Sequence, residues 1–415
     1  MNLNDYEKSM LAGEFGYPRR HALQQQIQVG HFFDARDFVE ISQVHLMADT
    51  ESLGEAGVGY LEELAGYPEK DRKVSVPTIT DPRGIDLCRF RALGQKEEWA
   101  RLEKRAIAAF ESFGILMTNT CINYQIVQAP VFGEHIAFGD TGSVIYANSV
   151  CGARSNFEGG PAALTAAFTG RVPRYAYHLD KYRRATHIFN IEFQPVDFAD
   201  WGALGAVLGQ RTGSYWNVPA LTGIESTPTS DQLKHFGAAL ASYGSVPLFH
   251  IDGVTPEAAD ISKVVEGNLL SLPGGSITTA DVDDFYKKQD RHKGKVDVVV
   301  LAAPQLSLTE MQLIAAMIEG RYVHQDTDFV VATAPEVKAA CDRMAITRTL
   351  EEAGVMVLEG VCFYQMYAKE TGEANGWKNL VSNSAKLVNI IQGYGYVPVL
   401  ATTERCVEAA VTGSI

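Results

Sequence analysis

The chain of 415 residues has no apolar run approaching the roughly 20 residues that a helix needs to cross a membrane. Its first residues also lack the basic segment followed by an apolar stretch that marks a secretion signal. The six cysteines are widely spaced and form no CxxC pair, which favours free thiols in a reducing compartment over a disulfide framework. From these absences we expect a cytoplasmic protein without membrane contacts.

Positive charge is also scarce. The 36 Lys and Arg residues are outnumbered by 50 Asp and Glu residues, and the formal net charge is −14. Nucleic-acid binding depends on clustered basic residues, so this balance argues against a nucleic-acid partner. With 46% hydrophobic and 21% charged residues the composition is ordinary for a globular protein, and the length predicts two or three packed units.

From about residue 185 onward, short β-rich runs alternate with helical patterns. HIFNIEFQPV, NVPALTGI, KVDVVVLAAP and GVMVLEG are typical of strands, whereas DFADWGALGAVLGQRTG, TSDQLKHFGAALASYG and SLTEMQLIAAMIEG are typical of helices. This alternation predicts an α/β fold of parallel sheets flanked by helices, in three parts: 1–184, 185–284 and 285–415. We further predict an amphipathic helix over 5–30, a buried strand over 115–120 and a helix over 255–267.

Several reactive side chains follow the predicted strands, where the ligands of parallel sheets gather. Cys121 and Cys362 could hold iron, an iron–sulfur cluster or zinc, because thiolates are soft ligands; each could equally be a small buried apolar residue. Glu134 and His135 form a pair suited to proton transfer or metal binding, or to a surface or capping role. EGGPAAL begins a helix at Pro161, and its free N–H groups either bind a carboxylate or phosphate or belong to an ordinary turn.

Several segments occur together in a characteristic order: MLAGEFG, VHLMADTESLGEAGVGYLEEL, KVSVPTITDPRGIDL, the long run from GEHIAFGDTGS to YAYHLD, PLFHIDGVTPEA, LTEMQLIAAMIEGR and SNSAK. In this order they resemble the catalytic large subunit or domain of the aconitase X family. The resemblance implies a hydro-lyase with an aconitase-like, multi-domain α/β architecture. In such proteins a small swivelling domain, fused or separate, closes over the cleft. Because the chain ends where the large subunit ends, the resemblance also implies a separate small swivel-domain subunit as partner.

The resemblance further implies an iron or iron–sulfur centre held by cysteines. Cys121 in TCINY and Cys362 in GVCF match two of them. The third cysteine is common in a GCPH motif, but this chain has AAPQ there, with Ala303 and Gln305 in place of the Cys and His. Cys151 is a candidate substitute, and a mononuclear iron with two thiolates is the competing arrangement.

Dehydration of a hydroxy acid needs a base for the α-proton, an acid for the departing hydroxide, and positive groups that hold the carboxylate. The run YANSVCGARSNFEGG is rich in polar side chains that would be costly to bury unpaired, and we expect it to line the cleft, with Arg154 gripping a substrate carboxylate. The predicted catalytic residues are Glu134, His135, Asn148, Ser149, Arg154, Ser384 and Lys386. The predicted substrate-binding residues are His45, Ser155, Asn156, Gly159 and Gly160.

The family contains dehydratases of different small 3-hydroxy acids. We expect cis-3-hydroxy-L-proline as the substrate, which would lose water to give Δ1-pyrroline-2-carboxylate. Phosphomevalonate is the alternative, and it requires a phosphate site. Because Ala303 replaces an expected ligand, a non-catalytic binding or regulatory homologue is the alternative of another class.

Overall fold

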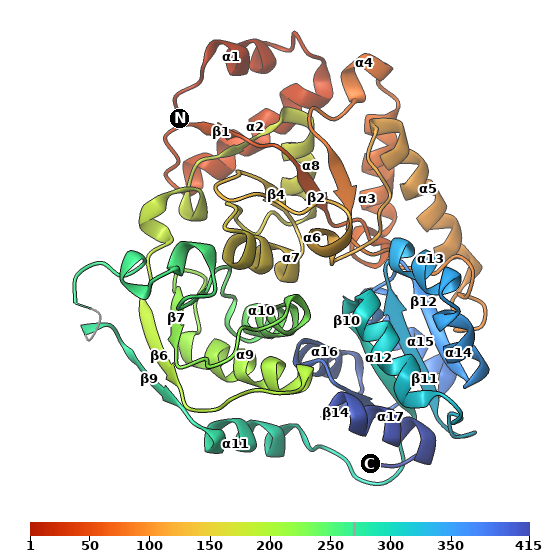
Figure 1. Cartoon of the computed structure of the whole chain (residues 1–415). Helices are drawn as coiled ribbons and strands as arrows, with labels where there is room; N and C mark the ends of the chain where they lie inside the picture. The colour runs from red at the N-terminus through yellow and green to blue at the C-terminus, as the bar shows by residue number, and fades with distance from the viewer. Residues whose placement is uncertain (269–270) are drawn as a thin grey trace.

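The computed structural model describes residues 1–268 and 271–415. Within them, three parallel sheets are each flanked by helices, and one short antiparallel pair completes the strands (Figure 1). The sheets have the strand orders β3-β2-β4, β8-β7-β6-β9 and β12-β11-β10-β13-β14. The α/β prediction is therefore confirmed. None of the helices in these residues is both long and apolar enough to cross a membrane.

The N-terminal part holds the three-stranded sheet and the antiparallel pair β1–β5. Its elements are α1 (Asp5–Ala12), α2 (Tyr17–Phe32), β1 (Phe38–Glu40), β2 (Val44–Leu46), α3 (Thr50–Ala65), α4 (Glu69–Arg72), β3 (Thr78–Thr80), α5 (Glu97–Phe113), α6 (Asn123–Ile126), β4 (Ala137–Phe138), α7 (Thr141–Tyr146), α8 (Gly160–Thr169) and β5 (Arg171–Pro173). A core of its own, with Val44, Phe110 and Phe168 among its buried members, packs α3, α5 and α8 against the sheet.

The middle part consists of β6 (His187–Ile191), α9 (Phe198–Thr212), β7 (Pro219–Thr222), α10 (Ser230–Gly244), β8 (His250–Ile251), β9 (Gly274–Ile277) and α11 (Thr279–Gln289). Helices α9 and α10 begin with capping boxes at Asp197 and Thr229. They approach so closely that a Cβ on Gly205 would lie 2.3 Å from the Phe236 carbonyl oxygen, so this crossing requires glycine.

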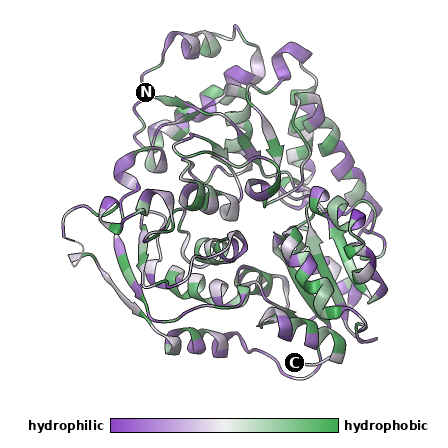
Figure 2. Cartoon of the chain, viewed as in Figure 1, coloured by the Kyte–Doolittle hydropathy of each residue, from purple (hydrophilic) through white to green (hydrophobic). Residues whose placement is uncertain are grey.

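The C-terminal part contains the five-stranded sheet. Its elements are β10 (Val298–Leu306), α12 (Leu308–Ile318), β11 (Asp328–Thr333), α13 (Pro335–Arg343), α14 (Ile346–Glu352), β12 (Val355–Glu359), α15 (Ala368–Asn375), β13 (Asn379–Ser382), α16 (Ala385–Ile391), β14 (Val397–Leu400) and α17 (Thr403–Thr412). All nine residues of β10 are buried, as expected for a strand covered on both faces. Figure 2 shows the apolar residues concentrated on these strands and the hydrophilic ones on the surrounding helices.

Three predicted elements are wrong in detail. Residues 5–30 form two helices, because Gly13 and Gly16 adopt φ values of 92° and 87° and break the chain between them. Residues 115–120 make only one β-bridge, Ile79 to Leu116, and Asn119 then turns the chain with φ 50°. Residues 255–267 contain two short 3₁₀ turns, Pro256–Ala258 and Ile261–Lys263, instead of a helix. The Thr255 hydroxyl bonds back to Ile251 and does not cap a helix.

Candidate active site

The carboxyl ends of the N-terminal and C-terminal sheets meet through side-chain contacts. Asp81 follows β3 and Asp140 follows β4, while Gln305 lies at the end of β10 and Lys386 near the start of α16. The Lys386 Nζ lies 3.3 Å from Asp140 Oδ1, and the Gln305 N–H donates to the Cys121 Sγ at 3.4 Å. Ligands of parallel sheets bind at such ends, so this junction is the candidate active site.

Cys121 and Cys362, which come together here, are 6% and 2% exposed. Burial, with the charges of nearby Asp140 and Asp81, raises the pKa of the Cys121 thiol. Burial, and then the Coulombic interaction with Cys121, raise the pKa of Cys362 well above its usual value, so the two thiols lie close enough to influence each other's ionisation. Both are therefore protonated at neutral pH until a cation displaces the protons.

A buried ion pair lies beside the thiols. Burial alone would raise the pKa of Asp140, but the Lys386 ammonium and the Ser143 N–H outweigh it, so the pKa lies below its usual range. Burial likewise opposes the charged form of Lys386, but Asp140 and the two thiols raise its pKa. Lys386 thus stays charged, with its Nζ 5.6 Å from the centre of the Tyr364 ring.

Asp81 and His45 complete the junction with unused hydrogen-bonding capacity. Among the described residues, neither carboxyl oxygen of Asp81 has a hydrogen-bond partner of normal geometry, and burial followed by the Asp140 charge raises its pKa well above the usual value. His45 Nε2 donates to the Thr120 carbonyl at 2.7 Å and lies 3.6 Å from Asp81 Oδ1. Burial lowers the pKa of His45, so the ring is neutral and its Nδ1 lacks a partner in this part of the chain. Unsatisfied buried groups of this kind mark a place for a ligand or water.

These residues fit a metal held by two thiolates better than a cluster held by three. Ala303 offers only a methyl group at the third position, and its carbonyl accepts a hydrogen bond from Ser384 at 2.6 Å. Across residues 1–268 and 271–415, no group of three or more His, Cys, Asp or Glu side chains is arranged to hold a metal ion. Soft thiolates suit iron, so Cys121 and Cys362 would hold it and leave further positions to other donors.

A second group of predicted residues lies elsewhere. Glu134 and His135 precede β4, at the opposite end of this strand from Asp140. His135 Nδ1 lies 2.9 Å from His178 Nδ1, and Arg154 pairs with the exposed carboxylate of Asp180 at 2.5 Å.

Cys151 belongs to this second group as well. Burial and the nearby charge of Glu134 raise the pKa of its thiol to about 11. The structure therefore brings Cys121, Cys362, Lys386, Ser384 and His45 together, and gathers Glu134, His135, Arg154 and Cys151 apart from them.

The polar run around residue 150 bonds mainly to the protein itself. Asn148 donates to the carbonyls of Ser155 and Pro247, each at 2.9 Å, and the Ser149 hydroxyl accepts from the Phe249 N–H at the same distance. Ser155 donates to the Asn156 carbonyl at 2.7 Å, and Asn156 Oδ1 accepts from Tyr177 and Tyr215.

These groups are buried and support the loop that leads into α8. Gly159 caps α8, and Gly160 lies beside Met47, two residues after His45. The two glycines therefore approach the carboxyl end of β2.

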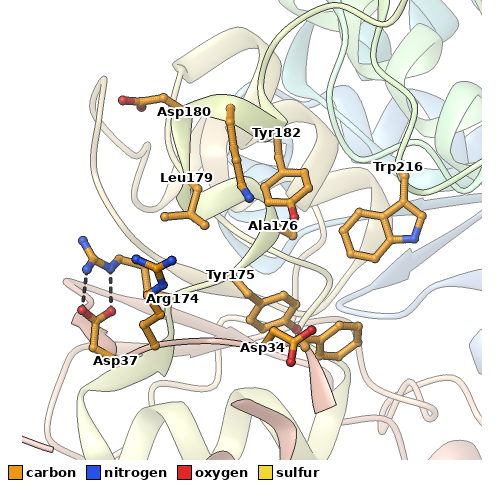
Figure 3. A pocket seen from close by; sticks show the side chains of 12 residues that line it. Asp34, Asp37, Arg174, Tyr175, Ala176, Leu179, Asp180, Tyr182 and Trp216 are labelled. Atoms are coloured by element: carbon orange, nitrogen blue, oxygen red, sulfur yellow. Dashed lines mark hydrogen bonds and ion pairs between the residues drawn. The ribbon is translucent and has the colours of Figure 1, made fainter. Parts of the chain in front are cut away.

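A pocket of about 740 Å³ lies between the end of α2 and residues 174–182 (Figure 3). Tyr175, Tyr182 and Trp216 give it aromatic walls, Arg174 and Asp37 pair at one rim, and Asp180 stands at the other. Because Asp180 is the partner of Arg154, the pocket adjoins the second group and not the thiols.

Sequence reasoning missed Asp81, Asp140 and Gln305. The signal was available for the first two, because TITD and AFGD each place an aspartate directly after a short β-rich run. In the sequence Gln305 stands out only as the replacement of a histidine, and its contacts depend on loops that are distant in sequence.

Comparisons with known proteins agree with this architecture. Three family models match the chain: aconitase X first domain over residues 1–181, second domain over 185–287 and third domain over 296–412. The fold and the site thus define an aconitase-type hydro-lyase, and the chain belongs to the aconitase X family.

Individual relatives span nearly the whole chain. It is 35% identical to the phosphomevalonate dehydratase large subunit of Methanothermobacter thermautotrophicus over 94% of each chain. It is 29% identical to the cis-3-hydroxy-L-proline dehydratase of Pseudomonas aeruginosa, over 99% of this chain and 70% of that one. The holo-form crystal structure of Thermococcus kodakaraensis aconitase X superposes with a TM-score of 0.86 at 27% identity, over 99% of this chain.

Proposed function

We propose that this chain is the large subunit of a two-subunit dehydratase that removes water from a small 3-hydroxy acid at an iron or iron–sulfur centre held by Cys121 and Cys362. The observation that supports this most is the junction itself, where two buried thiols, a charged lysine and a protonatable aspartate meet at the ends of two sheets.

Each of these residues has a chemical role in the proposal. Asp81, whose raised pKa keeps a proton within reach, is the proton carrier for the departing hydroxide. Lys386 offsets the negative charge that develops beside the substrate carboxylate, with Asp140 holding it in place. The bound iron centre would supply a Lewis acid for the hydroxide. Ser384 acts indirectly, because it caps α16 and thereby positions Lys386.

The substrate is proposed from the relatives. Phosphomevalonate is the first candidate, because the large subunits named for this reaction match the chain over nearly their full lengths. The second candidate is cis-3-hydroxy-L-proline, because the dehydratase named for it matches 99% of this chain. The charge of Lys386 is already balanced by Asp140, and Asp81 holds its proton, so Lys386 is not free to neutralise a phosphate.

A small-subunit partner follows from the same comparison. The relative of which the chain covers 94% is named a large subunit, whereas the chain covers only 70% of the cis-3-hydroxy-L-proline dehydratase of Pseudomonas aeruginosa. We therefore propose that a separate swivel-type subunit covers the junction and contributes to the site.

The test is co-expression with candidate small subunits, anaerobic reconstitution with iron and sulfide, and a screen of both acids for loss of water. Turnover of phosphomevalonate alone would establish the first candidate, and turnover of cis-3-hydroxy-L-proline alone would establish the second. Absence of turnover with either acid, in a complex that holds iron, would refute the proposed substrates.

A further inference from the structure

Gln305 connects the two loops that carry the thiols. Its side chain is fully buried, and its Nε2 donates to the Asn119 carbonyl and to the Val361 carbonyl, at 3.2 Å each. Asn119 lies two residues before Cys121, and Val361 comes directly before Cys362. One amide group therefore ties together two loops that come from different parts of the fold.

The main chain of Gln305 is fixed to the same centre. Its N–H donates to the Cys121 Sγ at 3.4 Å, and its carbonyl accepts from Lys234 Nζ at 3.2 Å. Lys234 is itself fully buried and paired with Glu310 on α12 and Asp231 on α10. Gln305 is thus fixed by Lys234 of the middle part of the chain, while its side chain binds one loop of the N-terminal part and one loop of the C-terminal part.

These contacts leave Gln305 little freedom. Replacing it with an apolar residue would leave two buried carbonyls without donors, a loss that the surrounding protein cannot repair with water at a fully buried position. The loop of Cys121 and the loop of Cys362 would then lack the hydrogen bonds through Gln305 that join them, and each would be positioned only by the strand next to it. A change in the relative position of the thiols is the direct consequence.

We infer that Gln305 is a positioning residue that sets the separation of the Cys121 and Cys362 thiols. The centre that these thiols form has two thiolate ligands, because Ala303 supplies no third one. This inference rests on the proposed function only in taking the two thiols as metal ligands. When a side chain that orients a metal ligand without contacting the metal is replaced, metal affinity commonly falls by about 10–100-fold.

The experiment uses Co²⁺ as a redox-inactive probe of thiolate coordination, followed by Fe²⁺ with sulfide, on the full chain in complex with its small subunit. The variants are Gln305→Leu, Gln305→Asn and Ala303→Cys. The matched control is Gln26→Leu, because Gln26 is also buried and donates to a backbone carbonyl, that of Arg171, but is remote from both thiol loops.

For Gln305→Leu we expect metal affinity to fall by at least about tenfold and the thiolate-to-cobalt absorption to change, while Gln26→Leu keeps both. Gln305→Asn, which retains the amide but is one methylene shorter, should show a smaller loss and serves if the leucine variant does not fold. Ala303→Cys should raise the thiolate-to-cobalt absorption per bound ion, because it adds a third thiolate at the same centre.

Unchanged affinity and spectrum in both Gln305 variants would overturn the inference, as would a wild-type complex that binds no metal. If the wild type binds cobalt and the variants respond as expected, but neither acid is dehydrated, the proposed reaction fails and the positioning role stands. If the wild type is active and the Gln305 variants match it, the positioning role fails and the reaction stands.

Discussion

Replacing Lys386 with methionine tests the electrostatics of the candidate site. Lys386 and Asp140 are 3% and 4% exposed, and their charged groups lie 3.3 Å apart. Removing one partner of a buried pair leaves the other charge uncompensated, which typically costs about 3–5 kcal/mol. Because the Ser143 N–H still bonds to Asp140, we expect Lys386→Met to lose about 3 kcal/mol of unfolding free energy at neutral pH.

The loss should depend on pH with a defined sign. In the wild type the pKa of Asp140 is lowered, so its contribution to stability is present above the ordinary pKa of an aspartate and is lost as the pH falls through the lowered value. Without Lys386, burial raises this pKa, and the folded state then holds the proton longer than the unfolded state. The difference in stability between wild type and variant should therefore widen from acid to neutral pH.

Metal binding should respond in the same experiment. Lys386 lowers the pKa of both Cys121 and Cys362, so its removal should raise both values and move half-saturation with Co²⁺ to higher pH. The measurements are urea unfolding across pH 5–8 and metal content over the same range. The control is Arg183→Met, which removes an equally buried cation that pairs with Glu257 at 2.7 Å.

The control should lose stability without moving the pH of half-saturation. If both variants shift metal binding equally, or if Lys386→Met shifts neither stability nor metal binding, the placement of Lys386 beside the thiols is wrong.

Three further outcomes are expected. Cys121→Ser should abolish metal binding and turnover with little change in the unfolding midpoint, and retained metal would remove Cys121 from the centre. Burial raises the pKa of Glu158 from 4.5 to about 7. Between these two pH values the folded state keeps the proton and the unfolded state loses it, so the free energy of unfolding should fall as the pH rises from 4.5 to about 7. Glu158→Gln should remove this dependence and gain up to about 3 kcal/mol at pH 8, checked by urea unfolding at several pH values. Arg154→Lys should leave kcat/KM within about threefold, because Arg154 pairs with Asp180 apart from the thiols, whereas contact with a substrate carboxylate would cost about 2–4 kcal/mol.

Local sequence patterns were enough for most helices and strands after residue 185, although not for residues 255–267. Asp197 and Thr229 begin their helices with capping boxes as the residue pattern indicates, and VDVVVLAAP is a buried strand. Capping and side-chain periodicity act within a few residues, so they can be read along the chain. The predictions over 5–30 and 115–120 failed where backbone turns at Gly13, Gly16 and Asn119 interrupted an apolar pattern.

The candidate site was only partly predictable. Two cysteines with soft-ligand chemistry and SNSAK pointed to Cys121, Cys362 and Lys386, and these three do meet. Glu134 and Arg154 belong to the same motif-rich segment as Asp140. Glu134 lies before β4, however, and Arg154 lies opposite that end of the strand, where its carbonyl accepts from the Ile136 N–H. A strand carries its two ends to opposite edges of a sheet, so nearness in sequence did not mean nearness in space.

By itself the sequence determined the α/β class, the family and the presence of two thiols with no third cysteine at the usual position. Only the tertiary structure decided which polar groups surround those thiols. The reason is physical: pKa values, unsatisfied carboxyl oxygens and the bridging amide of Gln305 all depend on burial and on contacts between loops that are hundreds of residues apart, whereas the chemical nature of each side chain is fixed by the sequence alone.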